Sequence, residues 1–322
     1  MRKFEIIGTI NPKTVNQEFL IDLNLAGVTI FRINGAHVDP EDIPEISILL
    51  RKSLKNKIKI QVDLGGSKIR TKNIYEPICI KKGKSLELKE ANFNYPDFLK
   101  ILDKGDIVLS SDGQLELTVE KVSKEKVKLK SRCDGFLLNN KGVHLITKSL
   151  AHLPVLSQKD KELVEFIKKG TIDYVGISFV RSPEQVQEVK SLFSDTPVKP
   201  IFKLETREAT QKDTLKRILD LHDTFSIDRG DLVSEVGMVQ FPEIFNRTLE
   251  ECLSRKKRIF VATQIFASMV NHNIPFISEL MEFDRLYRSD ISGIQLSEEI
   301  AIGKYPFEIL RIINERIESG EN

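Results

Sequence analysis

The sequence has no tryptophan, only four methionines and only three cysteines among its 322 residues. The cysteines, Cys79, Cys133 and Cys252, are odd in number and far apart along the chain. This spacing argues against a disulfide framework and against a zinc site built on cysteine pairs. We therefore expect reduced thiols in a cytoplasmic protein.

Long hydrophobic runs and an excess of one charge are also missing. No apolar run reaches the ~18 residues of a membrane span, and the N-terminus lacks the long apolar core of a signal peptide. The 49 Lys and Arg residues nearly balance the 47 Asp and Glu residues, and the net charge of +2 is too small to indicate a nucleic-acid or membrane partner. Expected partners are therefore small molecules.

Short β-rich runs alternate with segments of helical apolar spacing along most of the chain. The runs predicted as strands are residues 4–10, 28–34, 58–64, 174–179, 200–205, 224–228, 259–263 and 293–296. Segments such as 183–193 and 243–255 lie between them, and their apolar residues recur every three to four positions. Eight such units in roughly 240 residues predict an α/β fold, the TIM (β/α)8 barrel.

Residues 72–150 interrupt this alternation. They contain strand-like runs such as LELTVEKV and KVKLKSR, and no convincing crossover helix. We predict a small all-β domain over 72–150, inserted into the third strand–helix loop, while 1–71 and 151–322 form the barrel. Because such loops lie at the face where barrel active sites are built, the inserted domain should act as a lid that excludes water.

Charged residues gather at the C-terminal ends of the predicted strands. Lys203 and Glu205 share one face of their strand because side chains alternate, and Asp231 follows the next strand. Glu205 and Asp231 could share a divalent metal, while Arg32 and Arg70 suit phosphate oxygens. A solvated surface would explain any one such pair. The charged residues cluster at the ends of the strands and not at their starts, and this pattern favours a functional site.

A series of segments, in order along the chain, resembles motifs of the pyruvate kinase family. FRINGAH (31–37) is similar to the family's ARLNFSH, VDLGGSKIRT (62–71) to DLxGPKIRxG, and LSEEIAIGKYP (296–306) to LSGETAxGxYP. The other matching segments are TINP (9–12), LSSDGQLELTV (109–119), KGVHL (141–145), LPVLSQKD (153–160), ISFVRSPEQV (177–186), FKLE (202–205), RGDL (229–232) and ATQIFASM (262–269). The resemblance implies a TIM barrel with an inserted β domain. It also implies a glycolytic reaction, phosphoenolpyruvate plus ADP to pyruvate plus ATP, through an enolate stabilised by Mg²⁺ or Mn²⁺.

The resemblance also implies a role for each matched residue. Lys203 corresponds to the lysine that stabilises charge on the phosphoryl group in flight and on the enolate, and Thr263 to the threonine near the site of enolate protonation. The remaining roles are Glu205 and Asp231 as metal ligands, Arg32 and Arg70 at phosphate, Lys141, His37 and Pro12 at the nucleotide, and Gly230 with Asp231 at the substrate carboxylate through backbone N–H groups.

One departure from the family pattern concerns potassium. Family members often hold K⁺ with Asn, Ser, Asp and Thr side chains. Asn34 and Asp63 are retained here, but Ala36 and Leu64 lack the other two oxygens. Lys68 stands where K⁺-dependent members have Glu. We expect its ammonium, held by Asn34 and Asp63, to replace the ion, so that K⁺ is not required.

Further departures remodel the walls of the site. The family's Phe, Pro, Gly, Gly and Arg are replaced by Gly35, Ser67, Val233, Glu298 and Ile277 respectively. Three interpretations stay open: a phosphoenolpyruvate:ADP phosphotransferase, a related enzyme acting on another phosphorylated or 2-oxo acid in a biosynthetic pathway, and a non-catalytic relative. Retention of the central charges argues against the last, because clustered charges are costly without a use.

The chain ends soon after the eighth predicted unit. We therefore expect none of the sugar-phosphate effector regulation that resides in the family's C-terminal domain. Any homo-oligomer should associate through barrel surfaces.

Overall fold

Eight parallel strands form a closed barrel in the computed structural model, which describes residues 4–13, 15–54, 58–111 and 113–320. Around the barrel their order is β1-β15-β14-β13-β12-β11-β3-β2. Their bounds are β1 (Glu5–Ile10), β2 (Val28–Asn34), β3 (Lys59–Leu64), β11 (Tyr174–Ile177), β12 (Lys199–Lys203), β13 (Thr224–Asp228), β14 (Arg258–Ala262) and β15 (Gly293–Leu296). The predicted TIM barrel is confirmed, although the predicted strand 200–205 ends two residues early, at Lys203.

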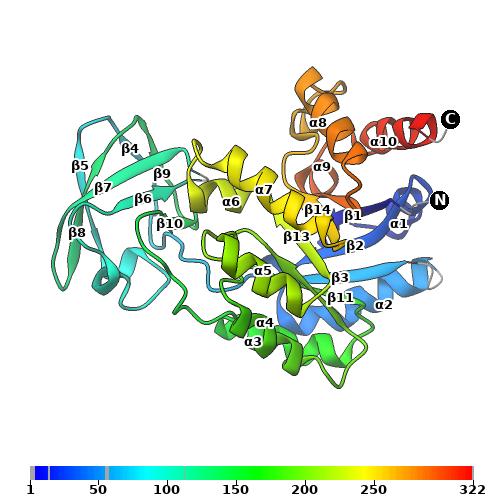
Figure 1. Cartoon of the computed structure of the whole chain (residues 1–322), viewed down its shortest axis with the longest axis horizontal. Coiled ribbons are helices and arrows are strands. Elements are labelled where there is room, and N and C mark those ends of the chain that lie inside the picture. Colours follow the sequence, from blue (N-terminus) through cyan, green and yellow to red (C-terminus); the bar gives the residue numbers. More distant parts are fainter. Residues whose placement is uncertain (1–3, 14, 55–57, 112, 321–322) are drawn as a thin grey trace.

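Helices cover the outside of this barrel (Figure 1). They are α1 (Gln17–Leu25), α2 (Ile43–Leu54), α3 (Gln158–Lys169), α4 (Pro183–Leu192), α5 (Lys212–Leu221), α6 (Arg229–Val236), α7 (Phe241–Ser254), α8 (Ile277–Arg288), α9 (Glu298–Ala301) and α10 (Pro306–Gly320). Local sequence fixes several starts. Before α3, Ser157 Oγ accepts a hydrogen bond from Asp160 N, and Ser182 caps α4 in the same way, with Pro183 in the first turn.

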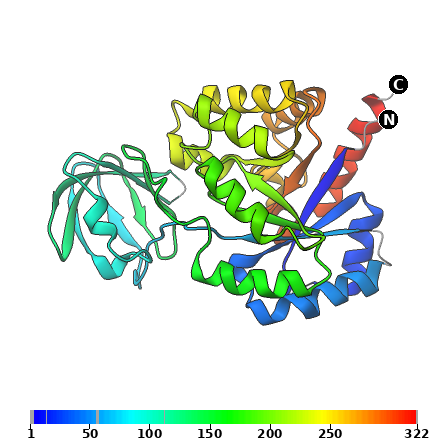
Figure 2. The same cartoon turned by 60° about the horizontal axis from the view of Figure 1, so that its bottom comes forward.

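A separate group of antiparallel strands lies at the end of the molecule far from both chain termini (Figures 1 and 2). Five strands pair in the order β10-β6-β7-β8-β5, and β4 pairs with β9. Their bounds are β4 (Ile78–Ile80), β5 (Ser85–Lys89), β6 (Ile107–Ser110), β7 (Leu115–Val122), β8 (Lys126–Ser131), β9 (Gly135–Leu137) and β10 (Val143–Leu145). These sheets, called the inserted sheets below, fall within the predicted insertion 72–150, whose exact boundaries stay a prediction.

The apolar core is divided in the same way. One large cluster joins the barrel strands to their helices, and a second cluster fills the inserted sheets. Inside the barrel, Ile7, Ile30, Ile201 and Phe260 form a small third cluster. Two residues further along three of these strands, the same inward face becomes polar, with Thr9, Arg32 and Lys203. An apolar plug therefore supports a polar layer at the C-terminal ends of the strands.

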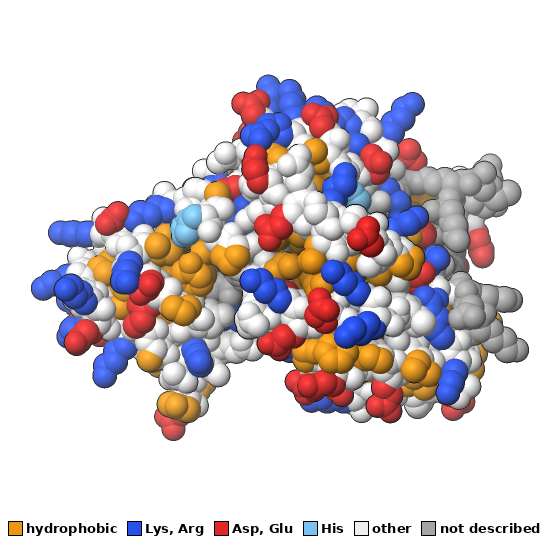
Figure 3. All heavy atoms as spheres, turned by 90° about the horizontal axis from the view of Figure 1, so that it is seen from below, with side chains coloured by type: hydrophobic (Ala, Val, Ile, Leu, Met, Phe, Trp, Pro, Cys, Tyr) orange, Lys and Arg blue, Asp and Glu red, His pale blue; other side chains and the backbone are white. Residues whose placement is uncertain are grey.

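Lys and Arg side chains are spread over the end of the molecule formed by the inserted sheets (Figure 3). Many face a carboxylate, as in the ion pairs Lys81–Asp134, Lys126–Glu87 and Arg132–Glu116. Exposed pairs of this kind contribute little stability and keep the surface solvated. Within the described part of the chain, no helix has the length and apolar character needed to cross a membrane.

Gly176 shows how the barrel makes room for a buried charge. It pairs with Asp63 across β11 and β3, and a Cβ at this position would lie 2.0 Å from Asp63 Oδ1. We predict that Gly176→Ala lowers the free energy of unfolding by about 1–3 kcal/mol, because the Asp63 carboxylate must move. Thermal and denaturant unfolding measure this loss.

The matched control is Gly65→Ala, where the nearest atoms to a new Cβ lie 3.9 Å away. If Gly176→Ala were as stable as Gly65→Ala, a Cβ at position 176 would not displace the Asp63 carboxylate.

Candidate active site

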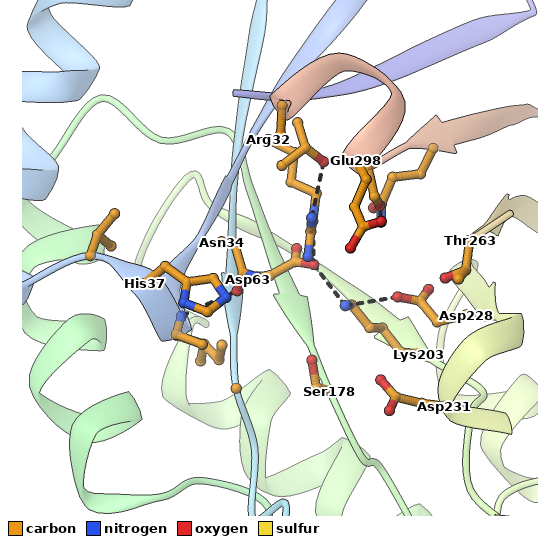
Figure 4. Close-up of a pocket in the computed structure, with 18 of the residues that line it drawn as sticks. Arg32, Asn34, His37, Asp63, Ser178, Lys203, Asp228, Asp231, Thr263 and Glu298 are labelled. Atoms are coloured by element: carbon orange, nitrogen blue, oxygen red, sulfur yellow. Dashed lines mark hydrogen bonds and ion pairs between the residues drawn. The ribbon is translucent and has the colours of Figure 1, made fainter. Parts of the chain in front are cut away.

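A cavity of about 500 Å³ opens at the C-terminal ends of the barrel strands. The side chains around it come from at least six strand ends and include Arg32, Asp63, Ser178, Lys203 and Asp228 (Figure 4). The cavity also collects other residues singled out from the sequence: Pro12, Asn34, His37, Lys68, Arg70, Asp231 and Thr263. Residues more than 250 positions apart in the chain therefore meet in one site, as the strand-end pattern predicted.

Asp63 is the centre of the charge network in this cavity. Its Oδ2 accepts a hydrogen bond from Arg32 Nε at 2.7 Å and lies 2.7 Å from Lys203 Nζ, while its Oδ1 accepts from Gln61 Nε2 at 2.6 Å. Burial alone would raise the pKa of Asp63, but Arg32 and Lys203 hold it well below its usual range. The carboxylate is thus ionised and fixes both cations.

Lys203 is held from a second side by Asp228. Lys203 Nζ donates to Asp228 Oδ2 at 3.0 Å, and Asp228 Oδ1 accepts from Ser226 Oγ at 2.9 Å. Burial would lower the pKa of Lys203, but Asp228 and Asp63 raise it well above its ordinary value. The lysine therefore acts as a fixed positive charge and not as a general base.

Glu205, two residues beyond Lys203, is fully buried and is not among the described residues that line the cavity. Its Oε1 accepts from Phe179 N at 2.9 Å, but its Oε2 has no hydrogen-bond partner among the residues that the structure describes. Burial raises its pKa well above the usual value; Lys203 opposes this shift, and the nearby Asp228 and Asp231 add to it. The surroundings of Glu205 are therefore short of positive charge.

The sequence expectation for Lys68 is corrected in one respect. Its ammonium pairs with Asp231 and not with Asn34 and Asp63. Arg32, Lys203 and Gln61 already occupy three of the acceptor positions of the Asp63 carboxylate. Burial would raise the pKa of Asp231, but Lys68 and His144 lower it.

The buried centre has the composition of a divalent-cation site. Four carboxyl groups, from Asp63, Glu205, Asp228 and Asp231, lie near three cations, from Arg32, Lys68 and Lys203, and Glu205 is the one that has no ion pair among the described residues. The described residues contain no group of three or more metal-ligating side chains close enough to hold an ion by themselves. A Mg²⁺ ion commonly needs only one or two carboxylates, with water and substrate oxygens completing its shell. The unpartnered Oε2 of Glu205 fits that requirement.

The opposite wall of the cavity suits anions. Arg70 lines it and donates Nη1 to Asn140 O at 3.2 Å, at the edge of the inserted sheets. Burial and the neighbouring Arg70, Lys159 and Arg32 lower the pKa of His37, so its imidazole is neutral at pH 7. Two further predicted residues, Lys141 and Gly230, are not among the described residues that line the cavity.

Arg229 holds the backbone that carries Thr263. Its Nε and Nη2 donate to Thr263 O at 3.0 and 2.8 Å, Nη2 also donates to Gln264 O at 2.8 Å, and Nη1 pairs with Glu282 at 2.9 Å. Thr263 and Gln264 have φ of +73° and +56°, a region that a β-branched residue rarely occupies. The Arg229 contacts therefore stabilise a strained conformation at the site.

A buried pair joins the inserted sheets to the barrel. His144 on β10 lies 2.8 Å, Nδ1 to Oε1, from Glu235 on α6, and both side chains are almost fully buried. Gly142 permits this packing, because a Cβ there would lie 2.6 Å from Lys68 Cε and 2.7 Å from His144 Nε2. The inserted sheets are thus anchored to the same helix that carries Asp231.

Sequence reasoning missed three of these residues. Asp228 ends its strand, so the strand-end rule applied to residues 224–228 would have found it. Arg229 contacts the backbone of Thr263 and Gln264 through its long side chain. The sequence does not show that these residues lie close to Arg229. His144 lies in the matched segment KGVHL without a predicted role, and only the fold brings it to Glu235.

The substituted wall positions have different consequences. A Cβ at Gly35 would lie 2.4 Å from Asp63 O, so this backbone excludes the family's Phe there. Ala36 and Leu64 line the cavity without side-chain oxygens, and Glu298 lines it with a carboxylate (Figure 4). Ile277 is exposed on α8, while Ser67 and Val233 are half-buried.

Comparisons with known proteins place the chain in a family. The family model described as "Pyruvate kinase, barrel domain" matches residues 1–310. Proteins named pyruvate kinase from Borreliella burgdorferi, Thermotoga maritima and Aeropyrum pernix are each 30% identical to the chain. The matches cover 96%, 100% and 94% of this chain and 66%, 72% and 67% of the relatives. The chain therefore spans about two thirds of their length.

The His144–Glu235 pair generates a stability prediction. His144→Ala leaves the Glu235 carboxylate buried without its partner, and we expect a loss of about 1–3 kcal/mol in the free energy of unfolding. Amide hydrogen exchange over β10 should accelerate more than exchange over the barrel strands, because the lost contact joins β10 to α6. The exposed His152→Ala is the matched control. Unchanged protection of β10 would show that the pair does not anchor the inserted sheets.

Proposed function

The chain belongs to the pyruvate kinase family of phosphotransferases, and we propose that it transfers a phosphoryl group from phosphoenolpyruvate to ADP. The bond between phosphorus and the enol oxygen breaks, and a bond from phosphorus to an oxygen of the ADP β-phosphate forms. The C3 atom of the remaining enolate then takes up a proton, which leaves pyruvate and ATP. Such a transfer depends mainly on alignment and charge neutralisation, for which the cavity is suited.

The observation that carries this proposal is the fixed position of Lys203. Asp63 and Asp228 hold its ammonium at the cavity wall, and its raised pKa keeps it charged. A preorganised positive charge lowers the energy of a transition state in which negative charge develops nearby. Arg32, held by Asp63 and Thr9, adds a second such charge on the same wall.

We assign divalent-metal binding to Glu205 and Asp231. The unpartnered Glu205 Oε2 supports this assignment, since a bound divalent cation would supply the positive charge that the surroundings of Glu205 lack. When bound, Mg²⁺ or Mn²⁺ supplies positive charge opposite the transferring phosphoryl oxygens. Arg70 and His37, on the opposite wall, would orient the nucleotide, and Lys141 would approach it from the inserted sheets.

Thr263 is proposed to lie where C3 is protonated. Arg229 fixes its backbone, and Gly230 allows close approach, since a Cβ there would lie 2.8 Å from Thr263 Cγ2. The backbone N–H groups of Gly230 and Asp231, in the first turn of α6, are proposed to bind the substrate carboxylate.

The deciding experiment measures pyruvate formation from phosphoenolpyruvate and ADP with Mg²⁺. We expect turnover in the unaltered chain and a loss of at least about 100-fold in Lys203→Met, because a preorganised charge at the transferring group is removed. Lys199→Met, on the exposed start of the same strand, is the matched control. Absence of turnover in a chain that still binds Mg²⁺ and oxalate, an enolate mimic, would contradict the proposed substrate.

A second prediction concerns potassium. With Lys68 as an internal cation beside Asp231, we expect the same rate in K⁺ salts and in tetramethylammonium salts of equal ionic strength. Lys68→Met should lower turnover by about tenfold or more, and K⁺ should not restore it, because Ala36 and Leu64 offer no oxygen ligands. A strict K⁺ requirement in the unaltered chain would overturn this assignment.

The second candidate function keeps this chemistry but uses another phosphorylated or 2-oxo acid. Glu298 favours it, because its carboxylate lines a cavity that must admit an anionic substrate. Replacement by glycine, the family's residue, distinguishes the two functions. A large gain in kcat/KM for phosphoenolpyruvate in Glu298→Gly would indicate that the unaltered chain acts on another substrate.

Location and association stay predictions as well. The three cysteines are unpaired, which supports a cytoplasmic location. Phe276, Ile277, Leu280 and Met281 are exposed at the start of α8, and this apolar barrel surface supports self-association there.

A further inference from the structure

A second groove of about 670 Å³ lies where the inserted sheets meet the barrel helices. Ile107, Ile146 and Thr147 form its wall on the side of the inserted sheets. The barrel side comes from the turn before α5 and from α6 and α7. No residue lines both this groove and the catalytic cavity, among those that the structure describes.

Two arginines give the groove a positive character. Arg207 is half-buried, and its guanidinium has no hydrogen bond or ion pair with any described residue. Arg247 donates Nη2 to Thr210 O at 3.0 Å, three residues beyond Arg207 in the same turn. Neither arginine pairs with a carboxylate of the described chain, although Glu243 lies one helical turn before Arg247 and also lines the groove. An unpaired, half-buried guanidinium is stabilised by an anion that accepts its fork of N–H donors.

Two helices start at the groove, and one of them adds to this positive character. Gln211 precedes α5 and Gln240 precedes α7, and both line the groove. Neither side chain caps its helix. In α7 the Phe241 N–H already donates to Gly237 O and Pro242 has no N–H, so the backbone donors that supplement the arginines come from the first turn of α5.

The lining of the groove also includes four apolar side chains. Ile107, Ile146, Val236 and Ile244 face the groove beside the two arginines. We propose that this groove is a second, non-catalytic binding site for a small organic anion, a phosphate monoester or carboxylate with a compact apolar body. The anionic group would bind Arg207 and Arg247, and the apolar body would pack on the isoleucines and Val236. This site does not depend on the reaction proposed above.

The position of the groove would let a bound ligand influence how the inserted sheets lie against the barrel. Val236 of α6 lines the groove, while Asp231 of the same helix lines the catalytic cavity and Glu235 anchors His144. A ligand that touches Ile146 and Arg247 together contacts the inserted sheets and the barrel at once. Its binding should therefore favour this arrangement of the two parts over any more separated one.

Phenyl phosphate is a suitable probe, because it combines a dianion with a small apolar ring. We expect calorimetric titration of the full chain to show a site whose affinity falls about tenfold or more in Arg207→Ala/Arg247→Ala, since two charge-assisted contacts are lost. This site should persist in Arg70→Ala, which separates it from anion binding in the catalytic cavity. Benzyl alcohol, a neutral analogue, should bind far more weakly.

Two matched variants test the charge argument. Arg217→Ala removes an arginine of α5 that pairs with Glu184 away from the groove, and it should leave the affinity unchanged. Glu243→Gln should tighten binding, a gain that partial unfolding cannot imitate. Absence of binding at millimolar phenyl phosphate would overturn the proposal. So would an affinity that the double arginine variant and Glu243→Gln leave unaltered.

Discussion

The arrangement of the catalytic cavity depends on the buried carboxylate of Asp63. Arg32 and Lys203 come from β2 and β12; without this acceptor Arg32 would have no carboxylate partner among the described residues, and Lys203 would keep only Asp228. The barrel accommodates the carboxylate by placing Gly176 opposite it and Gln61 beneath it, above the apolar plug of Ile7, Ile30, Ile201 and Phe260. Because the two cations are fixed before substrate binds, they need not reorient when negative charge develops in the transition state, as water molecules would.

Helix α6 connects this centre to the rest of the molecule. In only eight residues it carries Arg229, which holds the strained Thr263 backbone; Asp231, which pairs with Lys68; and Glu235, which binds His144 of the inserted sheets. Its last residue, Val236, lines the second groove. A small displacement of α6 would therefore change the position of Asp231, the Thr263 segment and the attachment of the inserted sheets together. The buried ion pairs at both ends of the helix resist such a displacement.

The sequence predicted the barrel well, because short β-rich runs alternate with segments of helical apolar spacing along most of the chain. It also predicted that Lys203, Asp63 and Asp231 would meet, since strand ends converge at one face of a barrel. It was wrong about the partner of Lys68, because strand position does not tell which of several nearby carboxylates is already occupied. Arg229 and His144 were missed for a related reason. Each acts across a loop or a junction, and its partner follows from tertiary packing and not from local spacing.

The departures from the family pattern have a common electrostatic consequence. Ala36 and Leu64 remove two oxygens, Lys68 adds a fixed cation, and Glu298 adds a carboxylate at the cavity wall. A lysine tied to the chain cannot dissociate as a bound monovalent ion can, so the charge beside Asp231 no longer varies with the salt around the protein. The same tether fixes its distance from Asp231, whereas a mobile ion could adjust to different substrates. On the proposed role of Lys68, the site would exchange adaptability for a constant charge, and Glu298 is the departure that places a negative charge on the cavity wall.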